Sequence, residues 1–190
     1  MQLEPKWKSL IVQSEDPVFT PEQCLDIIRT GRLQEKETAK LIKDDGTVNT
    51  EIRTSSISWI PFDKLTPMYK RLKDYIHAVN NNHFGYEGVC LNEMAQYTEY
   101  SEGCFYDWHM DSAFSGEKQP PVRKISMTCL LSHESEFEGG YLQLINEKSS
   151  IKLKQGHAIF FSSFLRHRVT PIKNGNRKSL VVWFGGPSFR

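Results

Sequence analysis

The chain has 190 residues and a formal net charge of +1, with 24 Lys and Arg residues against 23 Asp and Glu residues. A chain of this length is expected to form one domain with a sizeable buried core. The balanced charge offers no electrostatic case for a nucleic-acid or membrane partner. No apolar run approaches the ~20 residues of a spanning helix, and the first residues lack a secretory signal, so we expect a cytoplasmic protein.

The cysteines are too scattered to suggest a shared structural role. None of them forms a C-x-x-C pair, and a chain of this size needs no disulfide framework. We expect free thiols in a reducing cytosol and no structural zinc site. The four residues are Cys24, Cys90, Cys104 and Cys129.

Two helices are predicted in the first half of the chain. Thr20-Pro21-Glu22-Gln23 offers an N-cap, a proline at the first helical position and a capping-box glutamine. Apolar residues follow, and Gly31 is expected to end this helix. A second helix is predicted over about 62–79, where apolar residues recur every three or four positions. The run Asn80-Asn81-Asn82 is expected to end it.

The second half is predicted to consist of short strands, because stretches rich in β-branched and aromatic residues alternate with turn residues. Eight strands at this spacing are typical of a sandwich or jelly roll. We therefore predict an α+β, mainly β fold, with a jelly-roll core over about 84–186 and supporting helices over about 1–82 that cover one sheet. The predicted strands lie near 90–99, 104–111, 123–132, 141–145, 150–154, 157–162, 167–172 and 178–184.

The segment Trp108-His109-Met110-Asp111 carries the first candidate ligands for a metal. Residues two apart in a strand point to the same face, so His109 and Asp111 would offer an imidazole and a carboxylate to one point. His167 is the best candidate for a third ligand, since it opens a predicted strand directly after a strongly apolar one. Two histidines and one carboxylate leave three positions open on a metal, as Fe(II) oxygenases require. A lone H-x-D pair also fits a buried histidine beside a turn aspartate.

Arg177 follows His167 by ten residues across a polar turn. A guanidinium stays charged and binds a carboxylate through two parallel hydrogen bonds, which suits the distal carboxylate of 2-oxoglutarate. The alternative is a surface arginine beside a turn.

The pairing of the strands around this turn decides which residues face the metal. A two-residue Asn174-Gly175 turn would pair His167 with Val182 and turn Arg177 to the wrong side. A three-residue loop or a bulge would pair His167 with Trp183, so we predict one of these. The inward residues would then be Arg177, Ser179, Val181 and Trp183.

Five segments of the second half carry a resemblance to a known family: Gln96 to Asp111, Arg123 to Ser132, Phe137 to Leu142, Gly156 to Phe161 and His167 to Leu180. In composition, order and spacing they resemble the prolyl/lysyl-hydroxylase-like branch of the Fe(II)/2-oxoglutarate-dependent oxygenases. The resemblance covers roughly 84–186 and is best with PKHD-type and related bacterial or phage hydroxylases. A phage member would work in the host cytoplasm.

The resemblance implies a double-stranded β-helix core, Fe(II) and 2-oxoglutarate as cofactors, and ascorbate as a reductant. Arg177 would bind the C5 carboxylate of 2-oxoglutarate, and Tyr97 and Ser179 match positions of that pocket. Some relatives have a further pocket tyrosine where this chain has Leu130, so either Arg177 carries more of the carboxylate binding or Thr128 assists it. The implied iron ligands are His109, Asp111 and His167.

The implied reaction is hydroxylation of a C–H bond with O2 and 2-oxoglutarate, releasing succinate and CO2. The resemblance favours a prolyl residue of a peptide or protein, with Tyr106 and Trp183 as substrate contacts. Polar segments at 36–54 and 111–122 are predicted loops near the site. Aromatic residues that either stack on a proline ring or pack the core are Tyr97, Tyr100, Phe105, Tyr106, Trp108, Phe114 and Trp183.

Three alternatives stay open. An oxidative demethylase of nucleic acid would use the same centre, but it predicts a basic groove that the charge balance does not support. A non-catalytic jelly-roll binding module would keep the fold without turnover. A metal-dependent hydrolase or cupin-like enzyme would use the same three ligands without needing Arg177.

Overall fold

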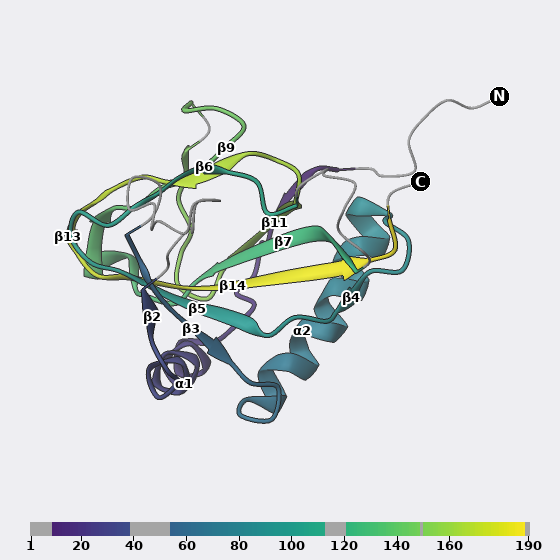
Figure 1. The fold of residues 1–190 in the computed structure, drawn as a ribbon, viewed down its shortest axis with the longest axis horizontal. Helices are drawn as coiled ribbons and strands as arrows, with labels where there is room; N and C mark the ends of the chain where they lie inside the picture. The colour runs from purple at the N-terminus through teal and green to yellow at the C-terminus, as the bar shows by residue number, and fades with distance from the viewer. Residues whose placement is uncertain (1–8, 39–53, 113–120, 149, 189–190) are drawn as a thin grey trace, which may run out of the picture.

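The computed structural model describes residues 9–38, 54–112, 121–148 and 150–188. The predicted loops at 36–54 and 111–122 lie largely outside the described residues, as does Phe114. Figure 1 shows a large sheet in the middle, with two helices on one side and smaller sheets on the other.

The first helix, α1 (Pro21–Arg32), begins as predicted. The Thr20 side chain accepts a hydrogen bond from the Gln23 backbone N–H (3.3 Å), and the Gln23 side chain accepts one from the Thr20 backbone N–H (2.9 Å). Gly31 does not end the helix, contrary to the prediction, because the helix continues to Arg32. A Cβ on Gly31 would lie 2.4 Å from the Tyr97 ring, so glycine here permits close packing of α1 on the sheet.

The second helix, α2 (Thr66–Val79), begins four residues later than predicted. The α-helix ends at Val79, where the asparagine run begins, as predicted; the run itself forms a π-helical turn, η1 (Asn80–Phe84), which ends at Gly85, whose φ is 75°. The Asn80 side chain bonds both backbone groups of Tyr86 and so ties the turn to the chain beyond it. The predicted apolar face is confirmed by the buried residues Met68, Tyr69, Leu72, Ile76 and Val79.

The main sheet is built from antiparallel pairs. Its strands are β1 (Ile11–Gln13), β2 (Glu37–Thr38), β3 (Ser56–Ile60), β4 (Cys90–Leu91), β5 (Ala95–Tyr100), β7 (Val122–Leu130), β11 (Ala158–Ser162) and β14 (Arg177–Gly186). Among the described residues their order is β1-β11-β7-β14-β5-β3-β2, and β4 also pairs with β14. The segment predicted as helical support thus also supplies three strands, β1, β2 and β3, which extend the sheet at both edges.

Two smaller sheets face the main one. Their strands are β6 (Tyr106–His109), β8 (Phe137–Gly139), β9 (Leu142–Leu144), β10 (Ser150–Ile151), β12 (His167–Val169) and β13 (Ile172–Gly175). One sheet has the order β10-β9-β12-β6 and the other pairs β13 with β8, which a 3-10 helix, η2 (Glu134–Glu136), precedes. Neither β8 nor β13 was expected, and β13 occupies the predicted turn.

The predicted hairpin between the strands of His167 and Arg177 is therefore wrong. His167 lies opposite His109 and Leu144, whereas β14 pairs with β5 and β7 in the main sheet. The chain crosses from one sheet to the other through β13. His167 and Arg177 consequently approach the same interior from opposite sheets.

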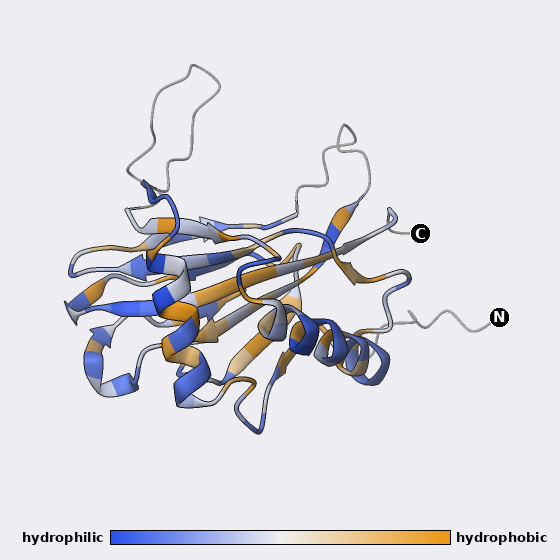
Figure 2. Cartoon of the chain, turned by 90° about the horizontal axis from the view of Figure 1, so that it is seen from below, coloured by the Kyte–Doolittle hydropathy of each residue, from blue (hydrophilic) through white to orange (hydrophobic). Residues whose placement is uncertain are grey.

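Apolar side chains fill both sides of the main sheet. One buried cluster joins α1 and α2 to the sheet and includes Ile27, Leu72 and Leu180. A second cluster lies between the sheets and includes Leu144 and Phe161. In Figure 2 the most apolar strand segments lie in the middle of the molecule. The helices cover one face of the main sheet, as predicted, and the interior between the sheets is left for a site.

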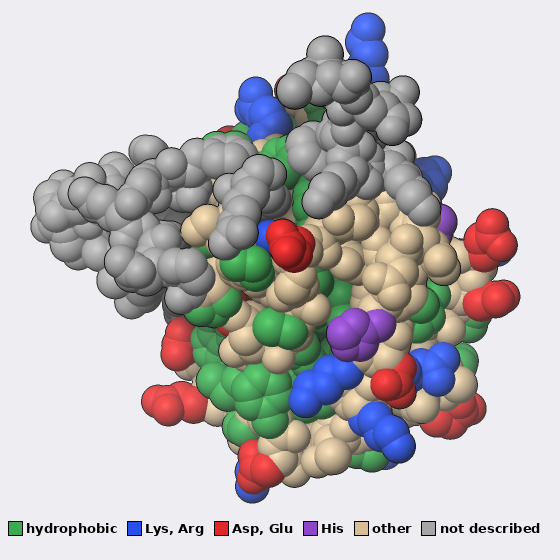
Figure 3. All heavy atoms as spheres, turned by 90° about the vertical axis from the view of Figure 1, so that its right-hand side faces the viewer, with side chains coloured by type: hydrophobic (Ala, Val, Ile, Leu, Met, Phe, Trp, Pro, Cys, Tyr) green, Lys and Arg blue, Asp and Glu red, His purple; other side chains and the backbone are tan. Residues whose placement is uncertain are grey.

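The surface carries charges of both signs, as the balanced composition of the sequence predicts. On the face shown in Figure 3, acidic and basic side chains are interspersed. Among the described helices, none has both the length and the apolar character that crossing a bilayer requires.

Candidate functional site

Two histidines face each other across the smaller sheet. His109 at the end of β6 and His167 at the start of β12 are directly opposed Cα partners, and their ring centroids are 4.1 Å apart. Directly opposed residues of an antiparallel pair share a face. Both rings therefore point into the interior, where potential ligand atoms of His109, Asp111 and His167 lie within 4.8 Å of one another.

Both histidine rings are held through their Nδ1 atoms. Nδ1 of His109 lies 2.7 Å from the carbonyl oxygen of Asp107, and Nδ1 of His167 lies 3.0 Å from that of Leu165. A carbonyl only accepts, so each Nδ1 donates its proton, and each Nε2 is the ring nitrogen that faces the Asp111 carboxylate. The rings are thus oriented as metal-ligating histidines usually are.

Asp111 lies two residues beyond the end of β6 rather than in the strand. Its backbone N–H donates to the carbonyl oxygen of Ser163 (3.0 Å), which fixes the bend. Its Oδ1 lies 3.7 Å from Nε2 of His109, and its Oδ2 lies 3.5 Å from Nε2 of His167. Burial raises the pKa of Asp111, but the imidazoles of His167 and His109 and a hydrogen bond from Ser126 bring that pKa below its ordinary value.

The donor set fits a divalent metal. Two ligand atoms at right angles, each about 2.1 Å from an ion, are about 3 Å apart. The measured Nε2–Oδ separations of 3.5 and 3.7 Å are close to this spacing. Two imidazole nitrogens and one carboxylate oxygen on one side of an ion form the set typical of non-haem Fe(II) oxygenases.

Ser126 supports the carboxylate from behind. Its hydroxyl donates to Oδ2 of Asp111 at 2.7 Å and lies 2.9 Å from the hydroxyl of Ser163. Ser126→Ala is expected to weaken Fe(II) binding by about tenfold, since groups that orient metal ligands contribute about 10- to 100-fold to affinity. Anaerobic competition with a chelator measures this. Ser58→Ala removes a buried serine that donates to the Gly31 carbonyl at 2.6 Å, away from the cavity, and should leave affinity unchanged. Equal losses in both variants would contradict the assigned role.

A cavity of about 340 Å³ opens over these three side chains. Arg177, Ser179, Val181 and Trp183 all line it, so the predicted inward set is confirmed although the predicted pairing is wrong. The candidate residues Thr128 and Tyr106 also line it. The Tyr106 ring stacks on the His109 ring with centroids 3.5 Å apart, at an interplanar angle of 12°.

Arg177 is buried, and the described residues place no carboxylate beside it. The residue is only 3% exposed, and its Nη1 donates to the Ser179 hydroxyl at 3.1 Å. Among the described residues, no carboxylate forms an ion pair with it, and its guanidinium carbon lies 5.5 Å from the Tyr100 ring centroid. Burial lowers the pKa of Arg177. A buried, unpaired guanidinium is costly, so this site is built to receive an anion.

Tyr97 is not part of this cavity, which contradicts the prediction that it lines the 2-oxoglutarate pocket. It faces α1, packed against Gly31, because alternate residues of β5 point to opposite sides of the sheet. Gln96 and Tyr100, its neighbours on the other face, line the cavity instead. Tyr100 lies directly opposite Arg177. The sequence pointed to the correct strand but to the wrong face of it.

The cavity also contains aromatic and charged residues that were not predicted. The ring centroids of Trp59 and Trp183 are 6.0 Å apart, and the Arg123 guanidinium lies 3.9 Å from the Trp183 ring centroid. Arg123 is held by Glu93 through two hydrogen bonds. Phe105 and Trp108 do not line the cavity. Trp108 instead lies under two arginine side chains, those of Arg166 (4.5 Å) and Arg168 (4.9 Å).

The comparisons with known proteins agree with this geometry. Residues 95–185 match the family model described as the 2OG-Fe(II) oxygenase superfamily. A PKHD-type hydroxylase of Synechococcus sp. strain CC9605 is 35% identical over 86 residues, which cover 44% of this chain and 37% of that protein. This chain thus spans little more than a third of the length of that relative.

Solved structures show a similar fold over most of the chain. A prolyl-4-hydroxylase of Pseudomonas putida matches with a TM-score of 0.71 at 19% identity, over 95% of this chain and 94% of that one. The viral collagen prolyl hydroxylase of Paramecium Bursaria Chlorella virus-1, solved as its 2OG complex, matches with a TM-score of 0.70 at 16% identity, over 95% and 97% of the two chains. The predicted jelly-roll fold is confirmed. Residues 95–185 thus match the 2OG-Fe(II) oxygenase superfamily, and the sequence and fold are similar to those of PKHD-type hydroxylases and prolyl-4-hydroxylases.

Proposed function

We propose that this chain hydroxylates a C–H bond of a prolyl residue in a peptide or protein, using O2 and 2-oxoglutarate and releasing succinate and CO2. One observation carries the proposal. A cluster of two histidines and one aspartate opens into the same cavity as Arg177, a buried guanidinium without a described carboxylate partner. The first feature suits Fe(II), and the second suits the far end of a dicarboxylate.

In this proposal His109, Asp111 and His167 hold Fe(II). The cavity over these side chains would give a 2-oxo acid and O2 access to the bound ion. When bound, iron and 2-oxoglutarate supply the oxidation: one oxygen atom of O2 enters the substrate and the other enters succinate. The chain itself needs no general base, because its task is to hold the reactants and to exclude water.

Arg177 would bind the C5 carboxylate of 2-oxoglutarate. The Ser179 hydroxyl holds Nη1 of the guanidinium, and Thr128 lines the same cavity as a further hydrogen-bonding group. Tyr100 lies opposite Arg177 on β5 and would lie beside the bound carboxylate. The negative charge of the ligand would offset the cost of burying the guanidinium.

The substrate side of the cavity is aromatic. Trp59 and Trp183 form one wall, and Tyr106 is held against the His109 ring. A saturated proline ring packs well on such faces without needing hydrogen bonds. Arg123 is engaged by Glu93, so this wall presents a neutral ion pair rather than a free charge. The two similar solved structures are prolyl hydroxylases by name, which supports the same choice of substrate here.

Anaerobic titration of the Fe(II)-loaded protein with 2-oxoglutarate, followed by visible absorption, tests the cofactor pair. We expect a weak charge-transfer band from the iron–oxo-acid chelate in the wild-type protein and none in His167→Ala. Mass spectrometry of proline-containing peptides after aerobic turnover then tests the substrate, by a gain of one oxygen atom. Absence of the band with iron demonstrably bound would favour a hydrolase or a binding module instead.

A further inference from the structure

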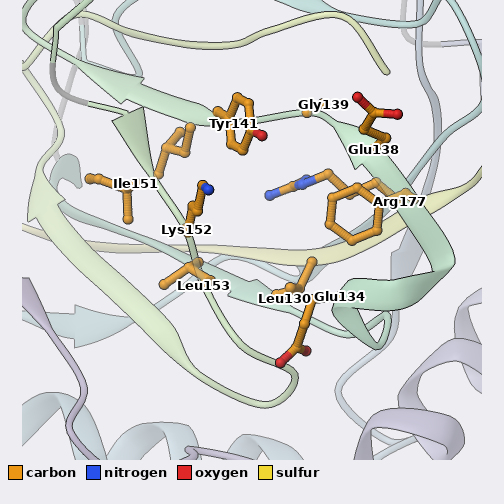
Figure 4. A pocket seen from close by; sticks show the side chains of 12 residues that line it. Leu130, Glu134, Glu138, Gly139, Tyr141, Ile151, Lys152, Leu153 and Arg177 are labelled. Carbon is orange, nitrogen blue, oxygen red and sulfur yellow. The ribbon is translucent and has the colours of Figure 1, made fainter. Parts of the chain in front are cut away.

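A second cavity of about 210 Å³ lies behind Arg177, on the side away from the metal cluster; we refer to it as the rear cavity. It is bounded by the segments that precede β9 and follow β10, together with the end of β7. Figure 4 shows the side chains of Arg177 and Lys152 reaching into this space beneath the ring of Tyr141. Its other lining residues are Leu130, Glu134, Phe137, Glu138, Gly139, Gly140, Leu142, Ile151 and Leu153.

Arg177 is shared by the two cavities. Its Nη1 donates to Ser179, on the wall of the metal cavity, while the side chain also lines the rear cavity. A guanidinium presents five N–H donors in one plane, more than one carboxylate and one hydroxyl use. Gly140 makes room for this arrangement, since a Cβ there would lie 2.8 Å from Cδ of Arg177. Donors therefore remain for a ligand on the second side.

The lining of the rear cavity holds two cationic side chains, Arg177 and Lys152, and two acidic ones, Glu134 and Glu138. Lys152 lies with its ammonium 5.6 Å from the Tyr141 ring centroid, and no described carboxylate forms an ion pair with it. The two acidic side chains of the lining are engaged elsewhere: Glu134 accepts from the backbone N–H of Gln155 (3.1 Å), and Glu138 lies 3.6 Å from Lys173. Two cations thus face one space without an anion between them.

The rest of the lining is apolar. Leu130, Phe137, Ile151 and Leu153 supply aliphatic and aromatic walls that a phosphate or sulfate ion would leave unfilled. The volume is below the roughly 300–1,000 Å³ of pockets for drug-sized ligands. An anion that contacts both the cationic side chains and the apolar wall is small and has one charged end and a short hydrocarbon chain.

We propose that the rear cavity binds a short-chain carboxylate, whose carboxylate lies between Arg177 and Lys152 and whose chain packs on the apolar wall. The effect of this binding rests on the proposed function, in which Arg177 also binds 2-oxoglutarate. Arg177 would then lie between two anions. The second anion competes for the charge of one guanidinium and repels the first. Binding at the rear cavity therefore weakens 2-oxoglutarate binding, and by linkage 2-oxoglutarate weakens the rear ligand by the same factor.

Direct binding is tested on the metal-free protein, with butyrate as the probe and amide NMR shifts as the readout. We expect saturable shifts at Tyr141 and Leu153. The affinity for butyrate should be at least fivefold weaker in Lys152→Met, which keeps the apolar stem and removes the charge. Lys154→Met, at an exposed lysine outside this lining, is the matched control and should bind butyrate as the wild type does. Shifts confined to Thr128 and Ser179, or unchanged binding in Lys152→Met, would overturn the proposal.

The coupling is tested by the anaerobic 2-oxoglutarate titration at rising butyrate. Saturating butyrate should raise the Kd for 2-oxoglutarate about fivefold in the wild type and in Lys154→Met, but not in Lys152→Met. An equal rise in all three proteins would mean competition in the metal cavity and would refute the rear site. If no 2-oxoglutarate band forms at all, the proposed function fails, while the NMR titration still decides on the rear cavity.

Discussion

Replacing Asp111 by alanine is expected to weaken Fe(II) binding by more than about 100-fold and to abolish hydroxylation. Asp111 is the one anionic member of the ligand cluster, and its carboxylate lies within 3.7 Å of both Nε2 atoms. Loss of groups that merely orient ligands costs about 10- to 100-fold, so loss of a ligand should exceed that range. The measurement is the iron content after anaerobic loading and gel filtration.

Asp107→Ala is the matched control for this change. Asp107 lies on the same strand, but its side chain is half exposed and lies 3.8 Å from Arg168. Its contribution to the site is the backbone carbonyl that accepts from His109, which alanine keeps. Iron binding should therefore be unchanged in this variant. If Asp111→Ala, with a native circular dichroism spectrum, still binds iron like the control, the cluster is not the metal site.

The candidate metal ligands could be predicted from the sequence because part of their signal is local. His109 and Asp111 are two residues apart, and the structure brings His167 opposite His109. What could not be predicted is how β12 and β14 reach the same interior. The sequence between them suggested a turn, whereas β13 pairs with β8, a partner more than 30 residues earlier in the chain. Such pairing depends on tertiary contacts rather than on local residue preferences.

The error at Tyr97 has the same physical origin. A strand presents its two faces alternately, so a shift of one residue moves every side chain to the other side. Tyr100 rather than Tyr97 lies opposite Arg177, and that register is fixed by the pairing of β5 with β14, about 80 residues apart. Gly31 was misread for a related reason: its function is to admit the Tyr97 ring against α1, which only the packed structure reveals.

Replacing Arg177 by methionine is expected to stabilise the free protein and to weaken its binding of 2-oxoglutarate. In the free protein the guanidinium is buried and lacks a described carboxylate partner, so methionine should raise the free energy of unfolding by about 1–2 kcal/mol. In the complex, loss of one member of a buried, hydrogen-bonded charge pair costs about 2–5 kcal/mol. The Kd for 2-oxoglutarate should therefore rise at least about 30-fold.

Urea denaturation with and without 2-oxoglutarate measures both effects on one Fe(II)-loaded sample under anaerobic conditions. The wild type should gain about 2.7 kcal/mol at a 2-oxoglutarate concentration of 100 times Kd, and Arg177→Met should gain at most about 0.9 kcal/mol at the same concentration. Arg29→Met, at an exposed arginine of α1, should change neither quantity by more than about 0.5 kcal/mol. A purely structural arginine would give the reverse pattern: Arg177→Met would be less stable than the wild type and would still be stabilised by 2-oxoglutarate. If Arg177 binds the dicarboxylate as proposed, its burial lowers the stability of the free fold, and the sign of the stability change in Arg177→Met distinguishes the two roles.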